Sequence, residues 1–348
     1  MIIKLAIDAM GGDFAPEIVI KGIIKALIEE KQLYINLYGD KIKINHIIKN
    51  KIVSSLYDSV KDRINLIHTS FYLSMDIKNI REELRDNPNN SLFLALKSAK
   101  DNQVDGVVSA GPTQALVLAS FLIIKTMNFM SRIALAPIFN SLDNKKRMLI
   151  DAGANIDITP ENLLNFAIYA SAAAKELFNI EKPIVKLLNI GIEKNKGRLL
   201  DQTVYNLLEQ DNRIIFKGNE EPQNILTTEA DILVSDGFTS NMILKSYEGS
   251  FQNSFQSIKK ILTDNWFKKI MSRILFAKQF CKIKKKLDAK ETGGAMLLGL
   301  NKIVIKAHGS SNDYAFYKAI IQAKILIEKN FLNKIYQKFN VKKSQKKI

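Results

Sequence analysis

Glycines and acids gather in the segment Ile7–Glu17, which reads IDAMGGDFAPE. Asp8 follows a short apolar run, Gly11 and Gly12 come next, and a proline and a glutamate then suit the start of a helix. Glycine permits backbone angles that other residues avoid, so a plain tight turn is one interpretation. The other is a loop that brings backbone N–H groups to a bound anion at the helix start. The segment alone leaves both open.

Small and polar residues also follow other apolar runs, in segments that read SAGPT, DAGAN, NIG, KGN, SDG and AHGSS. In a parallel sheet such segments meet at the carboxyl ends of the strands, where α/β proteins bind ligands. His308 differs from the rest because Gly309, Ser310 and Ser311 follow it. An imidazole there could transfer a proton while the small residues donate to an oxyanion. A helix N-cap beside an incidental histidine is the alternative.

The sequence lacks the motifs of nucleotide-binding and metal-binding sites and of a cysteine nucleophile. No G-x-G-x-x-G is present, and GVVSAGPT places Pro112 where a nucleotide-binding loop needs lysine. No His/Cys cluster has metal-ligand spacing, so we expect neither a metal nor another cofactor. Cys281 is the single cysteine, and this count fits a reducing compartment. It lies in a basic stretch away from the strand-end loops, so we do not expect it to be a nucleophile. His46 and His68 have no chemical neighbours and are expected to be structural or exposed.

The elements that would position these residues are short buried strands alternating with amphipathic stretches. Nine apolar runs predict strands at 2–8, 35–40, 63–70, 105–111, 147–153, 184–191, 213–219, 230–237 and 302–309. The clearest helix is 159–178, with Thr159 as N-cap and Pro160 at its first position. This alternation predicts a single α/β domain over residues 1–330, built on a doubly wound, mostly parallel sheet.

The composition indicates which kinds of partner the chain could bind and where it could act. The chain has 348 residues, 47% hydrophobic, and its 51 Lys and Arg exceed its 35 Asp and Glu, giving a net charge of +16. Such a charge attracts nucleic acid, an anionic membrane or an acidic protein. The longest apolar run, Ala115–Ile124, falls short of the ~18 residues that a membrane span needs. The start has no signal-peptide layout, so we expect a cytoplasmic protein.

Residues 251–290 break the pattern. They hold 11 Lys and Arg against two acids, a net of 11 − 2 = +9, and their apolar residues repeat at helical spacing around a possible turn at 263–265. This predicts an inserted amphipathic hairpin that lies in a membrane interface, with an ordinary dimer or core helix pair as the alternative. The expected membrane contacts are Trp266, Phe267, Lys268, Lys269, Ile270 and Ile274. Residues 331–348 are expected to form a flexible basic tail.

Long motifs in this chain resemble those of a known family. They read, in order, IDAMGGDFAPE, VSAGPTQAL, IDAGANIDITPENLLNFA, LLNIGIEKNKG, FKGNEEPQNI, DILVSDGFTSNMILKSYEG and GGAMLLGLNKIVIKAHGSSN, and they cover residues 3 to 328. The family that they resemble is PlsX, the acyl-carrier-protein:phosphate acyltransferases. The chain departs from the family's pattern at Pro112, Gln114 and Ser240.

The resemblance implies a fold and a reaction. The fold would be a three-layer α/β/α domain, similar to phosphotransacetylases and isopropylmalate-type dehydrogenases, working as a homodimer. The reaction would move a long-chain acyl group from acyl carrier protein to orthophosphate, and the acyl phosphate would feed a membrane glycerol-3-phosphate acyltransferase of phospholipid synthesis. A non-enzymic membrane-associated scaffold and a short-chain phosphotransacetylase are the alternatives.

Phosphate is itself a nucleophile, so the enzyme need only hold it beside the thioester, stabilise the oxyanion and protonate the leaving thiolate. Our candidates for phosphate or oxyanion binding are Gly11, Gly12, Ser109, Gly111, Thr113, Gly153, Asn155 and Gly237. Our catalytic candidates are Asn241, Lys245 and His308. Lys245 would neutralise phosphate charge, unless it is a solvated helix lysine, and His308 would transfer the proton. The strand-end acids Asp8, Asp13, Asp151 and Asp236 are expected to cap helices or orient neighbours, because like charges repel.

Overall fold

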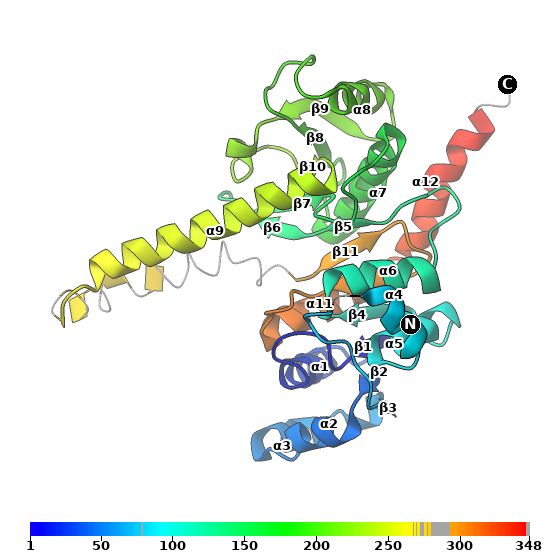
Figure 1. Cartoon of the computed structure of the whole chain (residues 1–348), viewed down its shortest axis with the longest axis vertical. Helices are drawn as coiled ribbons and strands as arrows, with labels where there is room; N and C mark the ends of the chain where they lie inside the picture. The colour runs from blue at the N-terminus through cyan, green and yellow to red at the C-terminus, as the bar shows by residue number, and fades with distance from the viewer. Residues whose placement is uncertain are drawn as a thin grey trace.

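Two sheets organise the protein in the computed structural model, which describes residues 1–77, 79–266, 268, 270–271, 275–276, 278–279 and 293–345. The larger sheet has the strand order β3-β2-β1-β4-β12-β11-β5, and the smaller one β6-β7-β10-β8-β9. Figure 1 shows them as two adjacent lobes, with β5 and β11 of the larger sheet nearest the smaller one.

The larger sheet consists of β1 (Ile3–Asp8), β2 (Leu33–Gly39), β3 (Ile64–His68), β4 (Gly106–Ser109), β5 (Ala134–Ala136), β11 (Ala295–Leu298) and β12 (Ile303–Lys306). Its strands run parallel from β3 to β12, whereas β11 is antiparallel to both β12 and β5. Central strands are buried on both faces, which explains their continuous apolar runs.

Helices cover both faces of this sheet. One core contains Leu5 and Ile305 with residues of α1 (Glu17–Glu29) and α11 (Asp313–Glu328). Alternate residues of the same strands, Ala6 and Val304, join a second core with α5 (Ser91–Lys100) and α6 (Thr113–Ile123). Three helices and a 3₁₀ turn complete this lobe: α2 (Lys41–Ile48), α3 (Lys51–Asp58), η1 (Lys61–Arg63) and α4 (Ile80–Asp86).

The smaller sheet consists of β6 (Ile138–Asn140), β7 (Lys146–Ile150), β8 (Ile184–Leu188), β9 (Ile215–Glu220) and β10 (Ile232–Val234). Only β6 is antiparallel to its neighbour within this sheet. The helices of this lobe are α7 (Pro160–Phe178), α8 (Leu199–Gln210) and the 3₁₀ turn η2 (Pro222–Asn224). Thr159 precedes α7 as predicted, although its hydroxyl accepts from the Asn162 side chain rather than from the backbone.

All nine predicted strands are present, and they divide between two sheets. Pro137 alone separates β5 of one sheet from β6 of the other. Proline has no N–H to donate to a strand ladder, so pairing is interrupted where the chain crosses. The short strands β5, β6 and β11 were not predicted.

The long helix α9 (Gly237–Leu262) leaves the body of the molecule and extends into solvent (Figure 1). It ends at the predicted turn, with Thr263 at its C-cap. Trp266 is 75% exposed, and Ile258, Ile261 and Ile270 are exposed as well. The predicted membrane contacts Phe267, Lys269 and Ile274, like Cys281, lie outside the described residues. None of the helices in the described residues is both long and apolar enough to cross a bilayer.

The C-terminal segment differs from the expected flexible tail. It forms α12 (Phe331–Gln345), and Phe331, Ile335 and Phe339 are buried. These three residues stand four apart, so they lie on one helical face. The prediction of a flexible tail is therefore wrong as far as Phe339, because this apolar stripe outweighs the basic composition.

Candidate functional site

Asp8, at the end of β1, is the centre of a buried polar cluster. Its carboxylate accepts hydrogen bonds from the hydroxyls of Ser91 and Ser109, each at 2.7 Å. The Ser109 hydroxyl oxygen in turn accepts the Gly111 N–H at 3.0 Å. Burial raises the pKa of Asp8, and the hydrogen bonds from both serines only partly offset that rise. Asp8 therefore orients its neighbours, the role that we predicted for it.

The glycines of the opening segment serve close packing. A Cβ atom on Gly11 would lie 2.5 Å from the Gly111 backbone nitrogen and 2.6 Å from the Asp8 carboxylate. Gly12 has φ +108°, and a Cβ atom on it would lie 3.1 Å from the Gly309 carbonyl oxygen. Three strand-end loops thus meet without room for side chains. In this structure the segment is a tight turn, and the predicted donors Ser109 and Gly111 are bound to protein.

Asp151 has a similar place after β7 of the smaller sheet. Its carboxylate accepts the backbone N–H groups of Leu135, Ala154 and Asn155 at 2.7 to 3.0 Å, and the Asn155 side-chain amide at 2.8 Å. Burial raises the pKa of Asp151 by more than these hydrogen bonds lower it. Gly237 donates its N–H to the Asn155 carbonyl at 2.8 Å, so the predicted residues Asn155 and Gly237 tie the Asp151 loop to α9.

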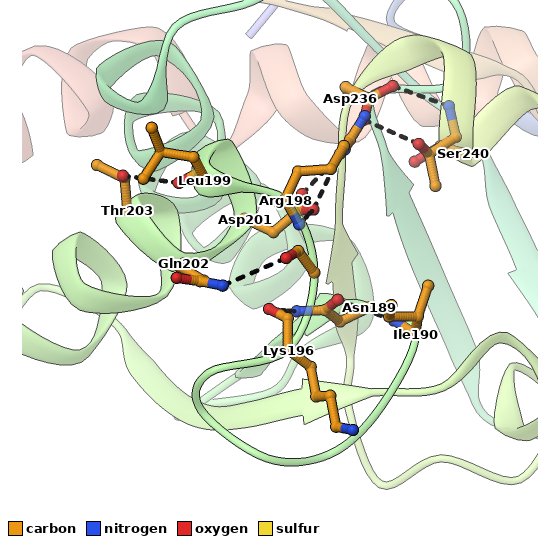
Figure 2. Close-up of polar contacts among 12 residues, drawn as sticks. Asn189, Ile190, Lys196, Arg198, Leu199, Asp201, Gln202, Thr203, Asp236 and Ser240 are labelled. Atoms are coloured by element: carbon orange, nitrogen blue, oxygen red, sulfur yellow. Dashed lines mark hydrogen bonds and ion pairs between the residues drawn. The ribbon is translucent and has the colours of Figure 1, made fainter.

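Asp236 caps α9 and forms an ion pair with Arg198 (Figure 2). It accepts the Thr239 N–H at 2.8 Å and the Arg198 guanidinium at 2.5 Å. Arg198 also pairs with Asp201 at 2.9 Å, which joins the start of α8 to the start of α9. Burial alone would raise the pKa of Asp236, but the bonds from Arg198 and Thr239 outweigh it and lower the pKa. The capping role predicted for Asp236 is confirmed.

A pocket of about 420 Å³ lies between these two edges. Its residues come from both lobes: Ile80, Arg81, Thr113, Gln114, Val117, Leu118, Phe121, Arg132, Ile133, Gly153, Ala154 and Asn155. Aliphatic and aromatic side chains form one wall, and the small residues at 153–155 and the first turn of α6 form a polar part. Two arginines supply positive charge. A volume of this size is ordinary for a small-molecule site.

The first turn of α6 gives the pocket its donors. Pro112 stands at the N-cap and makes no side-chain cap bond. Within the described part of the chain, the backbone N–H groups of Thr113 and Gln114 have no hydrogen-bond partner. Unpaired N–H groups and the positive end of the helix dipole together favour an anion. Arg81 and Arg132 line the same pocket and add two formal charges.

The structure gathers some predicted residues at this pocket and leaves others apart. Thr113, Gly153 and Asn155 line it, and Asn241 lies beside Gly153, since a Cβ atom there would be 3.3 Å from the Asn241 amide nitrogen. Lys245 is exposed on α9 and is absent from the lining. His308 is also exposed, and its Nδ1 lies 3.0 Å from the Ser310 hydroxyl.

Sequence reasoning missed three cations near these loops. Arg81 and Arg132 lie in segments without a motif, and only the tertiary structure brings them to the pocket. Lys306 did carry a signal, because a lysine that ends an otherwise apolar strand must be buried or must reach a ligand. Within the described residues, no group of three or more His, Cys, Asp and Glu side chains could hold a metal ion.

Comparisons with known proteins agree with this architecture. The model of a family described as "Fatty acid synthesis protein" matches residues 3–334. A "Phosphate acyltransferase" of Aster yellows witches'-broom phytoplasma (strain AYWB) is 51% identical over 343 residues, covering 99% of this chain and 93% of the relative. One from Acholeplasma laidlawii (strain PG-8A) is 40% identical and covers 96% and 97%. A solved phosphotransacetylase from Streptococcus pyogenes has a similar fold, with a TM-score of 0.62, 18% identity and 93% of each chain covered.

Proposed function

The chain belongs to the fatty acid synthesis protein family, and we propose that it transfers a long-chain acyl group from acyl carrier protein to orthophosphate. It is an acyltransferase of the phosphate acyltransferase type. One observation carries the substrate assignment: a single pocket joins an apolar wall to a polar, cationic part formed by both lobes. The apolar wall suits an acyl chain, and the arginines with the start of α6 suit phosphate.

The reaction needs little from the protein beyond position and charge. A phosphate oxygen attacks the thioester carbonyl carbon, the carbon–sulfur bond breaks, and a proton reaches the leaving thiolate. The products are acyl phosphate and the free carrier thiol. Arg81, Arg132 and the N–H groups at the start of α6 would hold the phosphate, which removes the entropic cost of bringing the reactants together. Thr113, Gly153 and Asn155 would lie around the reacting carbonyl.

The assay that tests this function measures acyl phosphate formed from long-chain acyl carrier protein and inorganic phosphate. We expect formation by the wild-type chain, and an Arg81→Met, Arg132→Met double variant should raise the KM for phosphate by about 10-fold or more. Arg85→Met is the matched control, because Arg85 lies on α4, pairs with Asp86 and does not line the pocket. No product with the wild type would refute the function and favour a scaffold role. Product from short-chain acyl coenzyme A alone would favour a short-chain phosphotransacetylase.

We also propose proton transfer by His308, which is exposed and outside the pocket lining, so that the transfer would need a bridging water. The hydrogen bonds from Ser310 fix the orientation of its imidazole beside the strand-end loops. His308→Gln should lower turnover by about 10²–10⁴-fold while phosphate still binds. Unchanged turnover would indicate that water, and not His308, protonates the leaving thiolate. Lys245→Met is expected to weaken phosphate binding if Lys245 neutralises charge, and to change nothing if it is a solvated lysine.

The acyl donor is proposed to be an acidic carrier protein rather than a free coenzyme A thioester. With a net charge of +16, the chain should attract an acidic partner through long-range electrostatics. Initial rates at sub-saturating acyl carrier protein should fall as salt rises from about 10 mM to about 150 mM, since the Debye length shrinks from about 30 Å to 8 Å. Rates that ignore salt, or equal rates with acyl coenzyme A, would remove this assignment.

We propose further that the protein is a cytoplasmic homodimer that binds anionic membranes through α9 and the residues after it. The exposed Ile258 and Ile261 near the outer end of α9 support this, together with the basic residues that follow. Release of a long-chain acyl phosphate at a bilayer would bring it to the next, membrane-bound acyltransferase.

Vesicle flotation tests the membrane proposal. Ile258→Asp, Ile261→Asp should abolish flotation with anionic vesicles at low salt. Gln252→Asp, Gln256→Asp adds the same charge to exposed positions on the opposite side of α9 and should float like the wild type. Dissociation of the first variant into monomers would instead assign the apolar stripe to the contact between subunits.

A further inference from the structure

Lys306 is a buried lysine at the end of the central strand β12. The residue is 6% exposed, and its Nζ donates to the Ala307 carbonyl at 2.5 Å and towards the Ala110 carbonyl at 3.4 Å. In the described part of the chain it forms no ion pair with a carboxylate within 4.0 Å. A buried cation held mainly by carbonyls is costly, and an apolar side chain of similar size would often be more stable there.

The strand register places Lys306 beneath the phosphate side of the proposed site. Lys306 is the lateral partner of Ser109 on β4, and side chains alternate along a strand, so Lys306 and Val304 share the face that α5 and α6 cover. Ala110 begins the loop that leads from β4 to Thr113, the first residue of α6. The Lys306 ammonium thus ties this loop to the loop that follows β12.

Two carboxylates act on this ammonium, Asp8 at the end of β1 and Asp13 in the next loop. Burial lowers the pKa of Lys306 to about 8, and the attraction of Asp13 and Asp8 limits that fall. The lysine is therefore charged at neutral pH and loses its charge only slightly above it. No step of the proposed chemistry so far uses this group.

We propose that Lys306 is a positioning residue for the phosphate site, which holds the Ala110 and Ala307 carbonyls so that the first turn of α6 faces the pocket. This inference rests on the proposed function, because the α6 donors are the proposed phosphate ligands. Lys306 reaches phosphate only through the backbone that it fixes. Its charge strengthens both hydrogen bonds, since charge-assisted bonds are about twice as strong as neutral ones.

The test compares Lys306→Met with a lysine at the other end of the same strand. Lys302 precedes β12, is partly buried and also has a pKa lowered by burial, but it lies at the amino end, away from the loops. We expect Lys306→Met to raise the KM for phosphate by about 10-fold while the KM for the acyl donor stays within about 2-fold, and Lys302→Met to change neither. Lys306→Arg should recover part of the phosphate affinity.

Two readouts separate positioning from a merely structural role. The Lys306→Met protein should unfold at the same temperature as wild type or higher, because the cost of burying a charge is relieved. The ratio of wild-type to Lys306→Met affinity for phosphate should fall as pH rises through about 8, where Lys306 loses its charge. Taking the ratio cancels the titration of phosphate itself.

Phosphate binding is measured directly, by the shift in unfolding temperature on adding inorganic phosphate, so the test does not depend on turnover. If the wild-type protein binds phosphate but makes no acyl phosphate, the proposed function is refuted. The comparison of phosphate affinity between wild type and Lys306→Met then still decides this inference. Equal phosphate affinity in wild type and Lys306→Met would overturn it. If Lys306→Met does not fold, Lys306→Gln keeps an amide donor, and an unchanged phosphate affinity in that variant would overturn it equally.

Discussion

Asp8 ends one buried parallel strand and Asp236 follows another, one in each sheet, and each residue is 2% exposed. Burial pushes both pKa values upwards, yet the pKa of Asp8 is raised and that of Asp236 is lowered. Two differences act together: the Asp8 carboxylate lies deeper in the protein than that of Asp236, and neutral serine hydroxyls donate to Asp8 whereas the Arg198 guanidinium donates to Asp236. Deep burial with neutral donors favours the protonated acid, whereas a charged donor favours the carboxylate.

The same contrast applies to the residues around each acid, at the carboxyl ends of the strands in the two sheets. At the larger sheet, Asp8 and Ser109 lie in a closed, fully buried cluster with Lys306 beside them. At the smaller sheet, Arg198 is 55% exposed and reaches across from the start of α8 to hold the start of α9. The first edge depends on packing, and the second depends on an ion pair that solvent can reach. We expect the second to respond more to salt.

The largest expected effect tests whether close backbone packing also stabilises the carboxyl edge of the smaller sheet. A Cβ atom on Gly237 would lie 2.3 Å from the Asn155 carbonyl oxygen, so Gly237→Ala must displace the start of α9. We expect it to lower the free energy of unfolding by about 3 kcal/mol. Gly249→Ala, in the same helix with nothing within 4 Å, should raise it by about 1 kcal/mol. Urea denaturation measures both, and equal effects would contradict the packing at Gly237.

The next effect concerns the acids themselves. Asp236→Asn removes the charge that Arg198 faces and should cost about 1–2 kcal/mol at neutral pH, after allowance for the solvent around Arg198. Asp8→Asn should cost less, because it also removes the penalty of burying an ionised carboxylate. Chemical denaturation of both variants at pH 7 gives the comparison. A greater loss for Asp8→Asn would show that its serine bonds outweigh the ion pair.

The pH dependence should have opposite signs at the two acids. Asp236 has a folded pKa below its ordinary 3.8, so its stabilisation is present above that value and is lost as pH falls through the folded pKa. Asp8 has a folded pKa above 3.8, so its contribution weakens as pH rises from 3.8 towards the folded pKa. Between pH 6 and pH 3, the cost of Asp236→Asn should shrink and that of Asp8→Asn should grow, by up to about 1 kcal/mol per pH unit. Parallel trends would refute the assignment of opposite shifts.

The smallest effect isolates the geometry of Arg198. Its guanidinium bonds Asp201 and Asp236 at once, which a lysine ammonium cannot match with the same planar fork. Because Arg198 is half-exposed, Arg198→Lys should cost only about 0.5 kcal/mol in the free energy of unfolding. The loss should shrink further in high salt. A loss that is large and independent of salt would mean that the pair behaves as a buried one.

Much of the fold was predictable from local patterns. Nine strands carry short apolar runs, as buried parallel strands do, and all nine are present, although the edge strands β3 and β9 are only partly buried. The strands β5, β6 and β11 escaped prediction because they pair antiparallel, whereas the pattern sought was that of buried parallel strands followed by small or acidic residues. The division into two sheets follows from Pro137 and from pairing partners distant in sequence, which no local pattern encodes.

The site was predictable in part. The strand-end loops do meet, and Thr113, Gly153 and Asn155 line the pocket between the lobes. Glycine spacing could not distinguish an anion loop from close packing, since both need the missing side chain, and Gly11 and Gly237 have backbone atoms against them. The pocket arginines come from segments without a motif, so only the tertiary structure could reveal them.

The order of strands in the larger sheet has a consequence for synthesis on the ribosome. β12, from residues 303–306, lies between β4 and β11, so the centre of this sheet stays open until residue 306 has emerged. The smaller sheet uses only residues 138–234, which are contiguous, and it can close first. Pairing between distant segments is slow, and domains tend to fold as they emerge. During synthesis the first-made lobe therefore waits with β4 as an unpaired edge while the lobe nested within it is already complete.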